Sequence, residues 1–160
     1  RVACFSIDDI YLTSAERKRL ALQVHPLLAT RGVPGTHDVE LGLQLIDNLK
    51  QLTAGQTLAL PLFNKAIDDR LQQKEWRQVT GPLNLILFEG WCVGAQPQAD
   101  EALSEPVNRL ERQEDPDLIW RRYVNRQLQT GYLKLFAGSY HSYGYFASVC
   151  YKYFFNHLLD

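Results

Sequence analysis

Acidic side chains follow two apolar runs of this sequence, and acids in such positions can bind a metal ion or take a proton from a substrate. Residues 82–94, PLNLILFEGWCVG, contain an uncharged run that ends at Glu89. Residues 2–7, VACFSI, are followed at once by Asp8 and Asp9. In open α/β sheets, ligands bind outside the carboxyl ends of the strands. These three acids are therefore candidates for binding a metal ion or for contacting a ligand.

The three acids could divide the work of a transfer reaction. One carboxylate could take a proton from a substrate hydroxyl while another holds magnesium, because that ion prefers a few carboxylates together with waters and phosphates. Two other interpretations stay open at this point. Glu89 could cap a neighbouring loop, and Asp9 could hydrogen-bond only its own turn.

Two loops supply cationic side chains that could bind an anionic small molecule. The segments RGVPGTHD and FNKAIDDR contain Arg31, His37, Lys65 and Arg70. Arginine is suited to this role because its planar guanidinium group matches the geometry of carboxylates and phosphates. The alternative for Arg31 and Arg70 is solvated surface, and for His37 it is an ordinary place in the core or on the surface.

The acids need strands to position them, and the apolar runs supply these. Residues 2–7 and 82–90 are apolar at successive positions, which is typical of strands buried on both faces inside a parallel sheet. Residues 57–65, TLALPLFNK, predict a further short strand that Pro61 interrupts. We expect the ends of the parallel strands to be neighbours along one edge of the sheet.

Capping residues predict two helices between these strands. Thr13 and Glu16 are spaced as a capping box, so a helix should run from about residue 14 to 29. Asp38 is the predicted cap of a helix with an apolar face over residues 39–49.

A third helix is expected near the end of the chain. A proline- and acid-rich connection over residues 94–117 precedes it, and apolar residues then recur from Leu118 to Leu133, with arginines at the start. Strands that alternate with helices in this way predict an α/β domain with a largely parallel sheet flanked by helices.

Composition excludes several classes of function. The chain has 160 residues, enough for one domain, and its 17 basic and 18 acidic side chains nearly cancel. Nothing therefore points to a nucleic acid or a membrane as a partner. The three cysteines are an odd number at unrelated spacings, which favours a reduced, cytoplasmic protein over a disulfide framework.

Four segments together resemble one known family. FSIDDIYLT, RGVPGTHDVEL, LPLFNKAIDDR and GPLNLILFEGWCVG occur in the order and with roughly the spacing of D-glycerate 3-kinase-like proteins. These are P-loop kinases related to uridine kinase, phosphoribulokinase and bacterial pantothenate kinase. The resemblance covers about residues 1–136. It implies a P-loop kinase-like parallel sheet, and ATP-dependent phosphoryl transfer, with magnesium, to a hydroxyl of a small hydroxy acid such as glycerate.

The resemblance also implies roles for individual residues. Asp8 corresponds to the acid that activates the acceptor hydroxyl, and Glu89 to the Walker B-like acid near magnesium. The substrate-binding side chains are then expected to be Asp9, Tyr11, Arg31, His37, Lys65 and Arg70.

The chain departs from the family pattern at both ends. Family members begin with a strand, a G-x-x-x-x-G-K-[ST] loop and a helix, but no such loop occurs in these 160 residues. Because that loop grips the phosphates of the nucleotide, we expect a domain truncated at its N-terminus and inactive by itself. The alternative is a non-catalytic remnant or binding module that keeps part of the fold.

The C-terminal departure divides the chain in two. Residues 1–136 are expected to form the central part of a kinase-like domain. Residues 137–160 form an aromatic-rich tail with neither a helical nor a strand period, where the family would continue with a buried strand and a lid helix.

Overall fold

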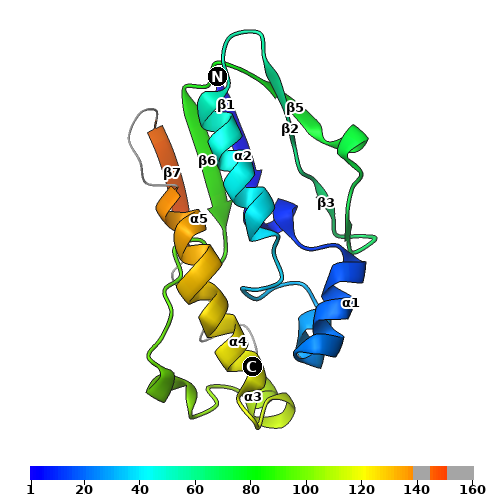
Figure 1. The fold of residues 1–160 in the computed structure, drawn as a ribbon, viewed down its shortest axis with the longest axis vertical. Helices are drawn as coiled ribbons and strands as arrows, with labels where there is room; N and C mark the ends of the chain where they lie inside the picture. Colours follow the sequence, from blue (N-terminus) through cyan, green and yellow to red (C-terminus); the bar gives the residue numbers. More distant parts are fainter. Residues whose placement is uncertain (139–144, 151–160) are drawn as a thin grey trace.

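Three parallel strands form the main sheet, with β6 in the middle (Figure 1). In the order in which they pair, the strands are β1 (Val2–Ser6), β6 (Leu85–Gly90) and β7 (Tyr145–Cys150). The computed structural model describes residues 1–138 and 145–150, and only the backbone of residues 145–150. The parallel sheet confirms the predicted α/β class.

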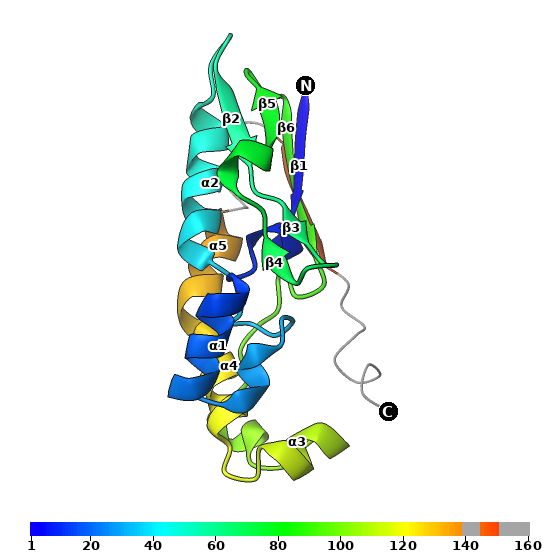
Figure 2. The ribbon, with the colours of Figure 1, turned by 90° about the vertical axis from the view of Figure 1, so that its right-hand side faces the viewer.

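The described residues bury one face of the sheet, whereas the sequence predicted burial on both. Ala3 and Phe5 of β1 are buried, but the alternate residue Val2 is 59% exposed. Figure 2 shows the reason, because the helices that cover the sheet lie on one side of it. Successive side chains of a strand point to opposite faces, so half of an apolar run faces outward here.

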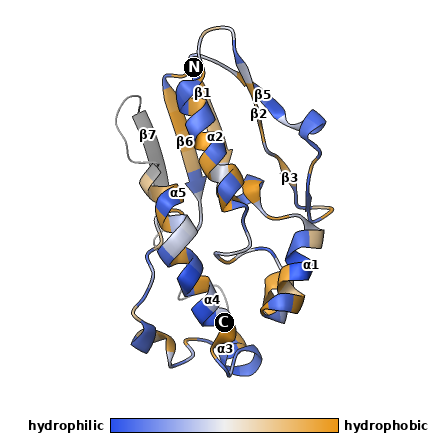
Figure 3. Cartoon of the chain, in the orientation of Figure 1, coloured by the Kyte–Doolittle hydropathy of each residue, from blue (hydrophilic) through white to orange (hydrophobic). Residues whose placement is uncertain are grey.

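Two helices, α2 (Val39–Gln51) and α5 (Leu133–Gly138), cover the buried face. Asp38 caps α2 as predicted, because its Oδ1 accepts a hydrogen bond from the Leu41 amide at 3.0 Å. The rings of Phe5 and Phe88 stack beneath the helices with centroids 4.7 Å apart. Figure 3 shows how hydrophobic residues follow β1 and most of β6.

The first helix, α1 (Ser14–Gln23), is shorter than the sequence predicted. Its capping box is present, with Glu16 Oε2 accepting from the Thr13 amide at 2.8 Å. The predicted end at residue 29 is wrong, because Pro26 begins a separate 3₁₀ turn, η2 (Pro26–Ala29). Proline lacks the amide hydrogen that a continuing helix needs.

An arm of antiparallel ribbons extends from the sheet (Figure 1). It contains β2 (Thr57–Leu60) paired with β5 (Arg77–Thr80), and β3 (Phe63–Asn64) paired with β4 (Asp69–Arg70). The strand predicted over residues 57–65 and its break at Pro61 are confirmed. Its partner β5 was missed, because RQVT is a short, mostly polar segment whose pairing only the fold reveals.

The C-terminal third carries more helix than the sequence predicted. It contains η4 (Asp100–Leu103), α3 (Arg109–Glu114), α4 (Ile119–Gln127), the π-helical turn η5 (Leu128–Tyr132) and α5. Two of these elements lie within the connection predicted over residues 94–117. The helix predicted from Leu118 to Leu133 is observed as α4 and η5, which lead directly into α5.

The sequence assigned no element to the aromatic tail, in which residues 145–150 form β7 beside β6. The backbone pairing in the sheet, rather than a hydrophobic period, defines this strand. The other tail residues, 139–144 and 151–160, lie outside the described residues.

Candidate active site at the ends of β1 and β6

Asp8 and Glu89 come from neighbouring strands at the same end of the sheet. Ser6, the last residue of β1, lies directly opposite Glu89 in β6. The chain then enters the 3₁₀ turn η1 (Ile7–Ile10), which carries Asp8. The expectation that the strand ends would be neighbours is confirmed by this register.

A glycine lets these two chain segments approach one another. Gly90 ends β6 with a φ of 154°, and a Cβ atom placed on it would lie 2.2 Å from Ile7 Cγ2. Because glycine is the only residue without a Cβ atom, the end of β6 can touch η1 this closely only with glycine at position 90.

The carboxylate of Asp9 makes a hydrogen bond within its own turn. Its Oδ2 accepts a hydrogen bond from the Ser6 amide at 3.0 Å, while Ser6 Oγ accepts from the Asp8 amide at 3.2 Å. Burial is the main cause that raises the pKa of the Asp9 carboxyl. The geometry therefore favours the alternative in which Asp9 shapes the turn that presents Asp8.

The two carboxylate oxygens of Asp8 have different surroundings. Oδ2 accepts a hydrogen bond from Lys65 Nζ at 2.7 Å. Oδ1 is buried and has no hydrogen-bond partner among the described residues. One oxygen is therefore held by a cation, and the other remains as an unsatisfied acceptor in the site.

Tyr11 joins Asp8 to His37. The rings of Tyr11 and His37 stack with centroids 4.2 Å apart, and the two residues form an isolated antiparallel bridge. Burial raises the pKa of the Tyr11 phenol, and the charge of Asp8 and a hydrogen bond to its side chain raise it further. Tyr11 is therefore a neutral phenol at physiological pH, held beside the carboxylate.

His37 lies in the interior, with 4% of its surface exposed. Its Nδ1 lies 2.5 Å from the phenol oxygen of Tyr132, and its Nε2 has no partner among the described residues. Burial lowers the pKa of His37 to about 3, although the charge of Asp8 acts in the opposite direction. The imidazole is thus neutral at pH 7 and cannot supply the positive charge that the sequence interpretation gave it.

Arg31 belongs to a cluster next to these aromatic side chains. Arg31 and the fully buried Arg17 both form ion pairs with Asp68, and both guanidinium groups lie over the Phe63 ring, at 5.5 Å for Arg17 and 5.7 Å for Arg31. Phe63 also meets the edge of the Tyr11 ring at 5.3 Å. The cluster therefore has two arginines for one carboxylate.

Sequence reasoning missed Arg17, Asp68 and Tyr132. Arg17 lies on a mostly polar helix, and Tyr132 was not distinguished within the helix predicted from Leu118 to Leu133. Asp68 offered one local signal, because aspartate tolerates the left-handed backbone conformation of turns, and its φ is 54°.

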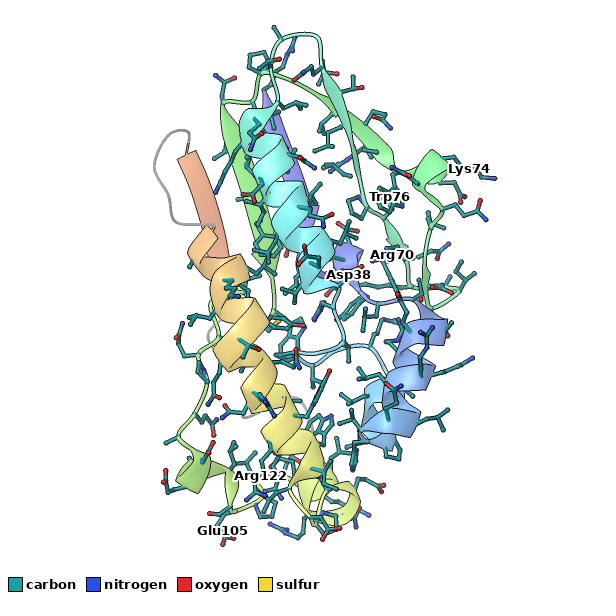
Figure 4. All side chains as sticks on the ribbon, in the orientation of Figure 1. Asp38, Arg70, Lys74, Trp76, Glu105 and Arg122 are labelled. Carbon is teal, nitrogen blue, oxygen red and sulfur yellow. The ribbon has the colours of Figure 1, made fainter. Side chains whose placement is uncertain are left out.

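Arg70 supports the fold at the edge of the site (Figure 4). Its Nη1 lies 3.0 Å from Oδ2 of Asp38, the cap of α2. The arm is thereby joined to the start of the helix that covers the sheet. Of the predicted substrate-binding residues, Tyr11, His37 and Lys65 gather around Asp8, whereas Asp9 and Arg70 have structural partners.

Comparison with known proteins gives the family. D-glycerate 3-kinase, chloroplastic, of Arabidopsis thaliana is 34% identical over an alignment of 137 residues, with coverage of 77% of this chain and 29% of that protein. A solved D-glycerate 3-kinase from Cryptococcus neoformans superimposes with a TM-score of 0.67 and 32% identity over 81% of this chain and 48% of that one. The chain belongs to the D-glycerate 3-kinase-like family. No protein-family model matches it.

A further relative is named only as a kinase. The uncharacterized kinase mug58 of Schizosaccharomyces pombe is 33% identical over an alignment of 135 residues, with coverage of 79% of this chain and 47% of that protein. The chain therefore spans less than half the length of the relatives compared here.

The described residues fit a partial magnesium site rather than a complete one. No group of three or more histidine, cysteine, aspartate or glutamate side chains that could hold a metal occurs among them. Magnesium usually takes only one or two carboxylates, with waters and substrate phosphates as its other ligands. Glu89, half-buried at the end of β6, can supply one such ligand.

P-loop kinases bind the phosphates of a nucleotide with the motif G-x-x-x-x-G-K-[ST]. This motif is absent from the 160 residues. Among residues 1–138 and 145–150, no helix is both long and apolar enough to cross a bilayer.

Proposed function

We propose that this chain supplies the acceptor side of a small-molecule kinase, with Asp8 as the general base and Glu89 as the magnesium ligand. The observation that carries the proposal is the pair of environments at Asp8. Lys65 holds Oδ2, while the buried Oδ1 has no described partner and lies at the carboxyl end of a parallel strand. Ligands of such sheets bind at that edge.

This geometry supports the proposed role of Asp8 as the base. A hydroxyl placed against Oδ1 can give its proton to the carboxylate as its oxygen becomes a nucleophile. The ion pair with Lys65 keeps the carboxylate in place, and Asp9 fixes the turn that presents it. ATP with magnesium would supply the phosphoryl group, and the loop that grips its phosphates would have to come from residues beyond these 160.

The acceptor that we propose is a small hydroxy acid such as D-glycerate, the substrate in the names of two relatives. Arg31 is the cation that we propose for its carboxylate, because two arginines share one aspartate in its cluster. Residues 1–136 then form the central part of the kinase domain. We also propose a cytoplasmic location, since three cysteines at unrelated spacings favour a reduced protein over a disulfide framework; the Arabidopsis relative is named as chloroplastic.

The deciding experiment measures phosphoryl transfer by the product of the complete gene. We expect the sequence upstream of Arg1 to encode an in-frame G-x-x-x-x-G-K-[ST] and the protein to release ADP when given Mg-ATP and D-glycerate. Loop-bearing protein that phosphorylates no small hydroxy acid would contradict the proposal.

A second candidate function is a binding module without catalysis, which the missing phosphate loop favours. For the 160-residue chain alone we expect no binding of Mg-ATP, because phosphoryl transfer depends mostly on positioning and electrostatics that the loop provides. Isothermal titration calorimetry tests this expectation. A dissociation constant in the micromolar range would show that another segment binds the phosphates.

A further inference from the structure

The hydrogen bonds around Tyr132 determine where His37 carries its proton. The Tyr132 oxygen accepts a hydrogen bond from the Gly35 amide at 2.8 Å and lies 2.5 Å from His37 Nδ1. If Nδ1 carried the proton, it would donate to this oxygen, and the buried O–H of Tyr132 would have no acceptor among the described residues. The O–H of Tyr132 therefore donates to His37 Nδ1.

This assignment makes Nε2 a hydrogen-bond donor. A neutral imidazole carries one proton, and with Nδ1 acting as the acceptor that proton resides on Nε2. Burial keeps His37 neutral at pH 7 by lowering its pKa to about 3. The Nε2–H is buried without a described partner, a state that is unfavourable unless a ligand accepts from it.

A second unsatisfied atom belongs to the same site. Asp8 Oδ1 is a buried acceptor without a described partner. Tyr11 connects the two residues, because its ring stacks on His37 and the charge of Asp8 helps burial to raise the pKa of its phenol. Asp8 is also the charged group that acts on the pKa of His37. The site thus holds one buried donor and one buried acceptor, each without a described partner.

The chemistry of the two atoms selects the ligand group. A hydroxyl can satisfy both, because its oxygen accepts from Nε2–H while its hydrogen donates to Oδ1. A carboxylate or a phosphate would accept from Nε2–H but would be repelled by the charge of Asp8. An ammonium group would suit Asp8 and has no lone pair for Nε2–H.

We propose that His37 Nε2–H and Asp8 Oδ1 together bind a hydroxyl group of the substrate, and that Tyr132 is the positioning residue that keeps the donor on Nε2. This inference rests on the proposed function, since the hydroxyl is that of the small acceptor. It replaces the interpretation of His37 as a cation for an anionic group. Tyr132 ends the π-helical turn η5, and such turns are frequent at functional sites.

Nuclear magnetic resonance tests the donor directly in the unaltered 160-residue chain. Long-range ¹H–¹⁵N correlation at pH 7 should show His37 protonated on Nε2 and unprotonated on Nδ1. D-glycerate, lactate or 3-hydroxypropanoate should then shift the Nε2–H resonance, whereas propanoate, which lacks a hydroxyl, should not. A proton on Nδ1, a charged ring, an equal shift with propanoate or no shift with any hydroxy acid would overturn the proposal.

Variants test the same pair. His37→Phe keeps a ring against Tyr11 and removes the donor, so binding of D-glycerate should weaken at least about tenfold, the value of one lost hydrogen bond. His25→Asn is the matched control, because His25 caps η2 instead, and its affinity should be unchanged.

Tyr132→Phe should release Nδ1 and produce a mixture of the two ring tautomers. Equal affinity in His37→Phe would refute the role of His37 as a donor to the hydroxyl. A single Nε2–H tautomer in Tyr132→Phe would refute the role of Tyr132 as the positioning residue.

The outcomes separate this inference from the kinase proposal. Binding is measured without ATP, so hydroxy-acid binding through His37 in a protein that transfers no phosphoryl group would refute only the kinase. Conversely, a loop-bearing enzyme whose KM for D-glycerate is unchanged by His37→Phe would refute only the role of His37.

Discussion

Lys65 Nζ lies 2.7 Å from Asp8 Oδ2, so a lysine whose side chain is 61% exposed holds the proposed base in place. Exposed ion pairs contribute at most about 1 kcal/mol to folding. In a loop-bearing enzyme, Lys65→Gln should therefore leave the unfolding midpoint nearly unchanged and lower kcat. Urea unfolding and steady-state kinetics measure the two effects, and unchanged kcat would show that Lys65 does not position Asp8.

The two adjacent aspartates should respond differently to substitution. Asp8→Asn cannot take a proton and should lower turnover by about 10²- to 10⁴-fold without unfolding the enzyme. Asp9→Ala removes the partner of the Ser6 amide and should cost about 0.5–2 kcal/mol of stability, as lost caps do. Normal turnover in Asp8→Asn together with abolished turnover in a folded Asp9→Ala would reverse the assignment.

Glu89→Gln should raise the magnesium concentration that a loop-bearing enzyme needs for half-maximal rate. A neutral amide is a poorer ligand for this cation than a carboxylate. Magnesium titration of the initial rate measures the shift, with Glu40→Gln, an exposed acid on α2, as the control. An identical magnesium dependence in Glu89→Gln would remove Glu89 from the metal site.

Arg17→Met should destabilise the chain by roughly 2–4 kcal/mol, because the fully buried guanidinium donates to the backbone carbonyls of Leu12, Ala29 and Asp68, which a methionine would leave unsatisfied. Arg17 donates to Leu12 O at 2.5 Å and to Asp68 Oδ2 at 2.6 Å. Arg19→Met, on the exposed side of the same helix, is the control and should change little. Equal unfolding midpoints for the two variants in urea would contradict the structural role of Arg17.

Acid should weaken the fold through His37. The unfolded histidine has a pKa of about 6.5, whereas the folded value is about 3. Between these values the unfolded state binds the additional proton. The stability that His37 contributes is therefore complete above about pH 6.5 and declines toward pH 3, by at most about 1.4 kcal/mol per pH unit.

Urea unfolding of the wild type and of His37→Phe at several pH values isolates this effect, since other titrating groups are common to both chains. As the pH falls, the wild type should lose stability relative to His37→Phe. A difference that does not vary with pH would show that His37 titrates normally in the folded protein.

Local signals predicted the parts of the site that depend on neighbouring residues. The capping box of Thr13 and Glu16 and the cap at Asp38 were predictable because each involves residues within one helical turn. The positions of Asp8 and Glu89 followed from the ends of apolar runs, since parallel strands place those ends along one edge.

The contacts that define the chemistry join distant parts of the chain. Arg17 and Asp68 are 51 positions apart, Lys65 and Asp8 are 57 apart, and Tyr132 and His37 are 95 apart. No local pattern encodes such pairs, because they form only when the arm and the C-terminal helices pack against the sheet. The proton position on His37 was unpredictable for the same reason.

The close approach of Gly90 to Ile7 also bears on how mutations in this gene should be interpreted. Even an alanine at position 90 would push against the residue that precedes Asp8. In a saturation mutagenesis screen, codon 90 should therefore tolerate no missense change, although its residue has no reactive group. Loss-of-function substitutions would then mark a position next to the candidate site where only the absence of a side chain matters. A search restricted to acids, bases and metal ligands would omit this position.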